Sequence, residues 1–70
     1  MSIVEISVSA GEILLALDRN GGTVRLEQLT QHRSCARDTA LMALGWLFKE
    51  GLVIVQPAVG DWVVKARPSG

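Results

Sequence analysis

A helix-length apolar segment that closes on a glycine constrains this chain more than any other feature. Over residues 36–50, alanine and leucine recur at helical spacing, and Ala40, Leu44 and Leu47 share one face. Gly51 follows directly, and glycine is the residue that most readily adopts the left-handed conformation found just beyond helix ends. The pattern predicts a helix over 36–50 that stops at Gly51.

The residues after this helix predict a β-hairpin. The run 52–56, Leu-Val-Ile-Val-Gln, is rich in β-branched residues, as is the run 62–66. Between them, 57–61 contains a proline and a glycine, which favour a turn. We therefore expect two antiparallel strands joined within 57–61.

The N-terminal third of the chain predicts a strand followed by a helix. Apolar and polar residues alternate over 2–8, a period typical of a short strand. Ser9 and Glu12 then have the spacing of a capping box, which predicts a helix over 10–19. Asn-Gly-Gly at 20–22 would end that helix.

The middle of the chain completes a known order of elements. We expect a brief extended segment at 23–25, a second helix over 26–32 and a turn at 33–35. Three helices with a C-terminal hairpin have the topology of a winged helix-turn-helix, an α+β fold, here with an additional N-terminal strand. We expect this domain to span 1–66 and the tail, 67–70, to be disordered.

Two phrases of the sequence resemble known winged helix-turn-helix proteins. The run 47–53, Leu-Phe-Lys-Glu-Gly-Leu-Val, resembles the entry to the wing of many bacterial regulators. Ala-Leu-Gly-Trp-Leu at 43–47 resembles the signature of a small prokaryotic family of stand-alone winged helix-turn-helix domains without an assigned function, and the resemblance covers about 11–64. It implies a DNA-regulator-like fold and a dimer. The chain departs from the family pattern at 37–39, which is less acidic, and at Ala40, which is smaller.

The composition indicates a partner more strongly than it indicates nucleic acid. The 70 residues are 49% hydrophobic and only 20% charged, and a chain this short is marginally stable alone. The net charge is zero, whereas nucleic-acid-binding modules usually carry a positive excess. A single cysteine fits a reducing, cytoplasmic setting, and no stretch is long and apolar enough to predict a membrane span.

The sequence offers little material for catalysis. His32 and Cys35 are the only histidine and cysteine, and two such groups fall short of a nucleophilic triad or a closed zinc site. Cys35 is best interpreted as a small buried hydrophobe at the helix-turn-helix turn, with a thiol redox sensor or a metal ion shared between chains as less favoured alternatives. We expect no catalytic residues, metal, cofactor or small-molecule substrate.

Four cations are the candidates for DNA contact: Arg33, Arg37, Lys65 and Arg67. The first two lie at the start of the third helix, and the other two share a face of the last strand. Four scattered cations predict a weak and salt-sensitive contact with DNA, and an ordinary solvated surface is the alternative explanation.

The third helix offers an apolar stripe where a DNA-reading helix would offer polar side chains. Leu41, Met42, Gly45 and Trp46 remain once the core positions are assigned, and Gly45 would allow a close backbone approach. We expect a second chain to cover this stripe in a homodimer, together with Ile3, Ile6 and Val8. The alternative is that the N-terminal strand of the same chain covers it.

Two functions remain open at this point. The resemblance and the fold favour a DNA-associated, transcription-regulator-like dimer. The neutral charge and the apolar third helix favour a protein–protein assembly module that uses the same fold without DNA. Fold alone does not decide between them, because one fold hosts many functions.

Overall fold

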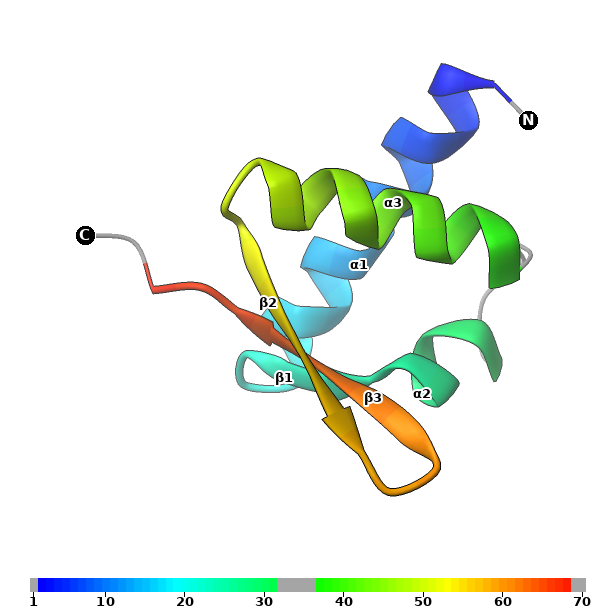
Figure 1. Ribbon diagram of the computed structural model, residues 1–70. Helices are drawn as coiled ribbons and strands as arrows, with labels where there is room; N and C mark the ends of the chain where they lie inside the picture. The colour runs from blue at the N-terminus through cyan, green and yellow to red at the C-terminus, as the bar shows by residue number, and fades with distance from the viewer. Residues whose placement is uncertain (1, 32–36, 69–70) are drawn as a thin grey trace.

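The computed structural model describes residues 2–31 and 37–68 and confirms the winged helix-turn-helix as an α+β fold. Helices and a small antiparallel sheet follow one another in the predicted order, except at the N-terminus (Figure 1). The elements of the described residues are α1 (Ile3–Arg19), β1 (Thr23–Arg25), α2 (Leu26–Gln31), α3 (Arg37–Lys49), β2 (Val53–Ala58) and β3 (Asp61–Ala66).

The predicted N-terminal strand is wrong, because α1 begins at Ile3 and runs without interruption to Arg19. Ser2, not Ser9, caps the helix: its Oγ accepts a hydrogen bond from the backbone N–H of Glu5 at 3.2 Å. Ser9 is instead buried inside the helix. Alternating β-branched residues suggested a strand, but helical spacing continues through this segment and a helix needs no neighbouring strand for its hydrogen bonds.

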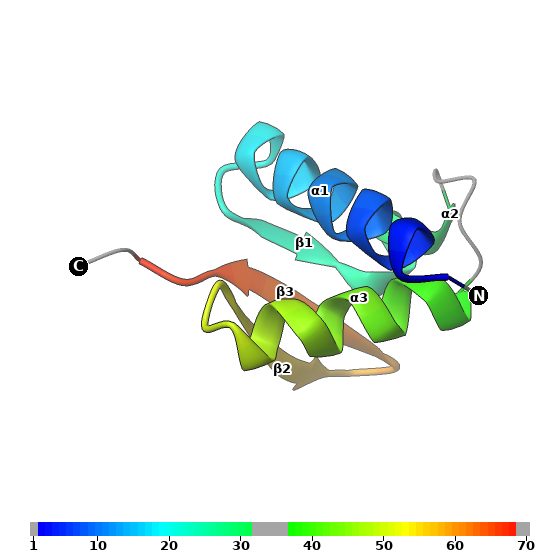
Figure 2. The same cartoon turned by 90° about the horizontal axis from the view of Figure 1, so that it is seen from above.

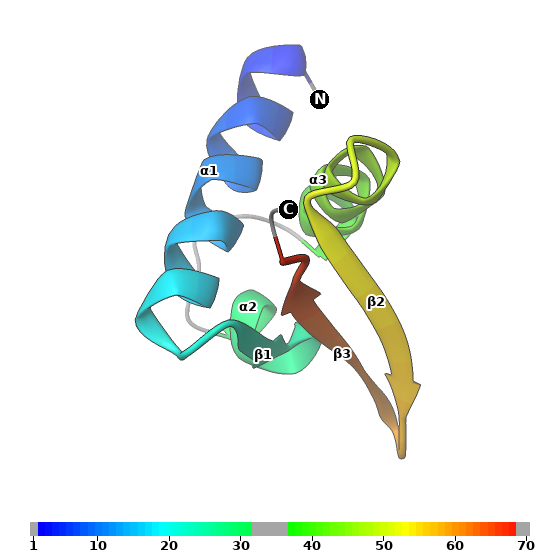
Figure 3. The same ribbon diagram turned by 90° about the vertical axis from the view of Figure 1, so that its left-hand side faces the viewer.

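The inward face of α1 shows that spacing. Ile6, Ala10, Ile13 and Leu17 recur every three or four residues and pack into the core, with Ile6 only partly buried. The two N-terminal turns of α1 project past α3 (Figures 1 and 3). The N-terminus therefore supplies a helix extension with largely exposed apolar residues instead of a strand.

Local signals set the ends of the other helices. Gly51 has φ +75°, and the backbone N–H of Leu52 donates to Leu47 O at 2.9 Å, which closes α3 in a Schellman motif as predicted. At the start of α2, the side chain of Gln28 accepts from the backbone N–H of Arg25 at 2.9 Å. The predicted last residue of the second helix and first residue of the third lie outside the described residues.

The sheet has the strand order β1-β3-β2, with both pairs antiparallel. Thr23 pairs with Lys65 and Val55 with Val64. The turn of the β2–β3 hairpin falls at 59–60, within the predicted segment, and Gly60 has φ +70°. The hairpin extends beyond the helices as the wing (Figure 1).

The core lies between α1, α3 and the inner face of the sheet. Figure 2 shows α1 and α3 side by side, and Val53 and Val64 reach the core from the strands. On α3, Ala43 and Leu47 are fully buried, as the sequence predicted for the core side of this helix. This packing fixes which face of α3 remains outside.

Candidate interaction surfaces

The outer face of α3 is apolar and uncovered. Leu41 is 42% exposed, Met42 52% and Trp46 46%, and Gly45 lies exposed among them. We call these four residues the α3 stripe. The alternative in which the N-terminal segment covers the stripe is not observed, because that segment is helical and the stripe is open to solvent. An apolar patch of this kind marks an interaction site more often than a chance exposure.

No neighbour within the described residues accounts for the glycine of the α3 stripe. Gly45 has ordinary helical backbone angles, and a Cβ placed on it would meet no atom within 4 Å. A glycine inside a helix costs about 1 kcal/mol relative to alanine. Any close backbone approach at Gly45 would therefore come from outside the described part of the chain.

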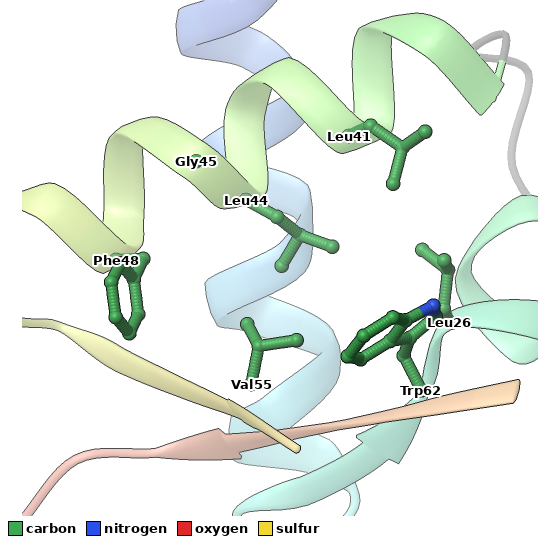
Figure 4. Close-up of a pocket in the computed structure, with 7 residues that line it drawn as sticks. All are labelled: Leu26, Leu41, Leu44, Gly45, Phe48, Val55 and Trp62. Carbon is green, nitrogen blue, oxygen red and sulfur yellow. The ribbon is translucent and has the colours of Figure 1, made fainter. Parts of the chain in front are cut away.

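A groove opens beside the stripe, between α3 and the wing. It encloses about 330 Å³. In Figure 4, Leu41 and Leu44 point from α3 toward the side of the groove that holds Trp62 on β3, and Phe48 points toward β2, so the walls are apolar side chains from elements far apart in sequence. The lining residues are Leu26, Leu41, Leu44, Gly45, Phe48, Val55 and Trp62. The stripe and the groove share Leu41 and Gly45 and form one continuous surface.

The N-terminal interface candidates lie on the projecting turns of α1. Ile3 and Val8 are exposed, whereas Ile6 is partly buried against the core. Ile3 and Val8 are thus available to a partner, and Ile6 contributes mainly to the fold of its own chain.

The cationic candidates do not form one surface. Arg37 is exposed at the start of α3, and Lys65 and Arg67 are exposed at the end of β3, on the opposite side of the view in Figure 1. Arg67 lies in the segment expected to be a disordered tail, yet its backbone N–H donates to Leu52 O at 3.0 Å. Arg33 lies outside the described residues.

The comparisons with known proteins agree with this architecture. A family model described as a winged helix-turn-helix domain, DUF2582, matches residues 1–66 of the chain. The chain belongs to this family. Neither the curated proteins nor the solved structures gave a match. The description of this family gives a fold and no activity, so the functional argument rests on the surfaces of this member.

Sequence inspection missed one cation of this DUF2582 member. Arg25 lies on β1, two residues from Thr23, the register partner of Lys65, so it is the diagonal neighbour of Lys65 on the same sheet face. Both side chains are exposed. The signal was present as the alternation Thr23, Val24, Arg25, but the pairing of this short segment with β3 was not predicted. We call the face that carries Thr23, Arg25, Ile54, Gln56, Val63 and Lys65 the outer sheet face.

The described residues of this DUF2582 member hold no group of three or more histidine, cysteine, aspartate or glutamate side chains suited to a metal ion. His32 and Cys35, the two residues weighed for redox or metal chemistry, lie outside the described ranges. No helix in the described part of the chain is long and apolar enough to cross a membrane. The winged helix-turn-helix fold typically works by binding.

Proposed function

We propose that this protein is a non-catalytic winged-helix assembly module that forms a homodimer through the outer face of α3. The observation that carries the proposal is the α3 stripe: three large apolar side chains and an unexplained helical glycine, all exposed. In a DNA-reading helix this face would offer hydrogen-bonding groups to base edges, and leucine, methionine and tryptophan side chains suit a protein partner better. The single cysteine supports a reducing, cytoplasmic setting.

Covering the α3 stripe with a second copy of the chain would be favoured by the free energy of apolar burial. Because Met42 and Trp46 are already about half buried, covering the rest at an interface would contribute roughly half of the 1.5–3 kcal/mol that complete burial of a large apolar side chain gives. A closed two-fold pair is the commonest soluble oligomer, and it presents the same patch from both partners. The exposed Ile3 at the start of α1 would extend such an interface, whereas Val8, five residues on, lies on another face of the helix.

The test of this proposal is the oligomeric state. Sedimentation of the wild type across a micromolar concentration series should show a monomer–dimer equilibrium. Trp46→Ala should shift it toward monomer, and Lys65→Ala, on the outer sheet face, serves as the control that leaves it unchanged. A wild type that remains monomeric at high micromolar concentration would refute the dimer.

DNA association is the second candidate function, and the outer sheet face supports it. Arg25 and Lys65 are diagonal neighbours there, and Arg67 follows one residue after β3, with its guanidinium near Gly51. Exposed cations of this kind suit phosphate contacts, which give affinity without sequence information. Titration with mixed genomic DNA fragments at two salt concentrations separates no binding, non-specific binding and the specific binding that a regulator requires.

A further inference from the structure

We propose that, in the dimer, α3 pairs antiparallel with α3 of the second copy about a two-fold axis midway between residues 43 and 44, and that Asp38 and Lys49 set this register. The inference rests on the proposed homodimer and adds which residues meet and what fixes their alignment.

The seam of this pairing is a line of exposed residues along α3. Asp38, Met42, Gly45 and Lys49 are separated by four, three and four positions, the spacing that keeps residues on one helix face. All four are exposed. Leu41 and Trp46 lie on either side of this line and widen its apolar middle. The two ends of the seam carry the charged residues Asp38 and Lys49.

A two-fold axis at this point pairs residues that lie equally far from it in opposite directions. Asp38 of one copy then lies beside Lys49 of the other, and Met42 beside Gly45, with each contact made twice. The long, adaptable methionine side chain fills the space that the glycine leaves open, so the two backbones approach closely. This arrangement supplies the outside neighbour that Gly45 lacks in its own chain.

Charge selects this arrangement over its alternatives. In a parallel pair in the same register, Asp38 would face Asp38 and Lys49 would face Lys49, which is repulsive. Moving the axis to Gly45 would place Lys49 beside Leu41 and leave Asp38 without its opposite charge. Among the described residues, neither Asp38 nor Lys49 has an ion pair or side-chain hydrogen bond that would compete for it.

Two charge-reversed variants test the register directly. Asp38→Lys alone and Lys49→Asp alone should each dimerise roughly tenfold more weakly than the wild type, because both ion pairs become repulsive. An equimolar mixture should recover most of the wild-type affinity as a heterodimer, since every contact is again between opposite charges. Recovery on mixing cannot come from a change in folding, because both chains keep their substitutions. Native mass spectrometry and sedimentation measure the heterodimer.

The matched control reverses charges away from the seam. Asp18→Lys and Lys65→Asp change the net charge by the same amounts at exposed positions on α1 and β3. Their mixture should show no preference for the heterodimer. If the wild type is a dimer and the seam variants dimerise as tightly as it does, the register is overturned and the homodimer stands. If the wild type is monomeric, both proposals fail.

A disulfide experiment keeps the register falsifiable if charge reversal unfolds α3. With Cys35 replaced by serine, Asp38→Cys mixed with Lys49→Cys should form a covalent heterodimer on mild oxidation. Each variant alone should not cross-link, because its two cysteines would lie about 16 Å apart along the helix axis at roughly 1.5 Å per residue. Equally rapid cross-linking of either variant alone would overturn the proposed register.

Discussion

The sheet and α3 both have one face in the core and one face outside, but the two outer faces differ in composition. Val24, Val53 and Val64 point inward, whereas Thr23 and Lys65 lie outside. On α3, Ala43 and Leu47 are buried, yet the outer face presents Leu41, Met42, Trp46 and Phe48. The outer sheet face is therefore mixed, with Ile54 and Val63 half-buried among polar and charged residues, whereas the middle of the outer face of α3 exposes large apolar side chains.

The difference between the outer faces of α3 and the sheet bears on whether this winged helix binds DNA or another protein. A winged helix normally offers the outer face of its third helix and its wing to DNA, and both surfaces would then be polar and basic. Here the middle of the outer face of α3 is apolar, and charged residues lie only toward the two ends of that helix, at Arg37, Asp38 and Lys49. Under the proposed function, the outer face of α3 contacts a second protein chain, and the outer sheet face remains available to solvent or phosphate.

The largest expected effect separates the two faces of α3. Leu47→Ala should lower the free energy of unfolding by about 2–5 kcal/mol at every protein concentration, because Leu47 is fully buried within one chain. Trp46→Ala should lower it more where the wild type is dimeric than where it is monomeric, since a dimer gains stability by mass action. Denaturant unfolding at two concentrations a hundredfold apart measures both. A loss for Trp46→Ala that is independent of concentration would place its contacts within the monomer.

The second effect contrasts two glycines at the same helix. Gly45→Ala should raise the stability of the monomer by up to about 1 kcal/mol, because alanine favours the helix and nothing in the chain obstructs its Cβ. Gly51→Ala should lower it by about 1–2 kcal/mol, because φ there is +75°. Thermal unfolding at low concentration measures both effects.

The same pair of variants sharpens the account of the outer face. Gly45→Ala should weaken dimerisation while it stabilises the monomer, because the added methyl group occupies the space for the second backbone. A variant that is more stable as a monomer and weaker as a dimer would show that the glycine serves the interface, because a glycine without a role in dimerisation would not change dimer affinity. If Gly45→Ala strengthens both, the close approach at Gly45 is wrong.

Most of the fold was predictable from local sequence signals. Gly51 and the run after it determine the end of α3 and the hairpin, and both signals act within a few residues. The predicted N-terminal strand was wrong because the sequence of this segment fits two periods. Val4, Ile6 and Val8 alternate as in a strand, and the same residues, together with Ala10 and Ile13, also fit part of a helical period. Only tertiary packing of α1 on α3 decides between the two.

The candidate surfaces were predictable in part. The α3 stripe follows from assigning the core positions of one helix, so its residues were identified before the structure. Arg25 was not, because its proximity to Lys65 depends on the pairing of β1 with β3, which are almost forty residues apart in the chain. Long-range register of this kind leaves no local signal in a three-residue strand.

The smallest expected effect concerns the outer sheet face, where substitution should leave the fold and the dimer unchanged. Arg25→Ala, Lys65→Ala and Arg67→Ala each remove an exposed cation, and such surface changes usually alter stability by less than about 0.5 kcal/mol. If the protein binds DNA through this face, each substitution should reduce the slope of log affinity against log salt by about 1, uniformly across DNA sequences. Arg37→Ala, at the distant start of α3, is the matched control and should leave the slope unchanged. A slope that falls for Arg37→Ala and not for the sheet variants would return the DNA contact to α3, and the division between the two surfaces would then fail.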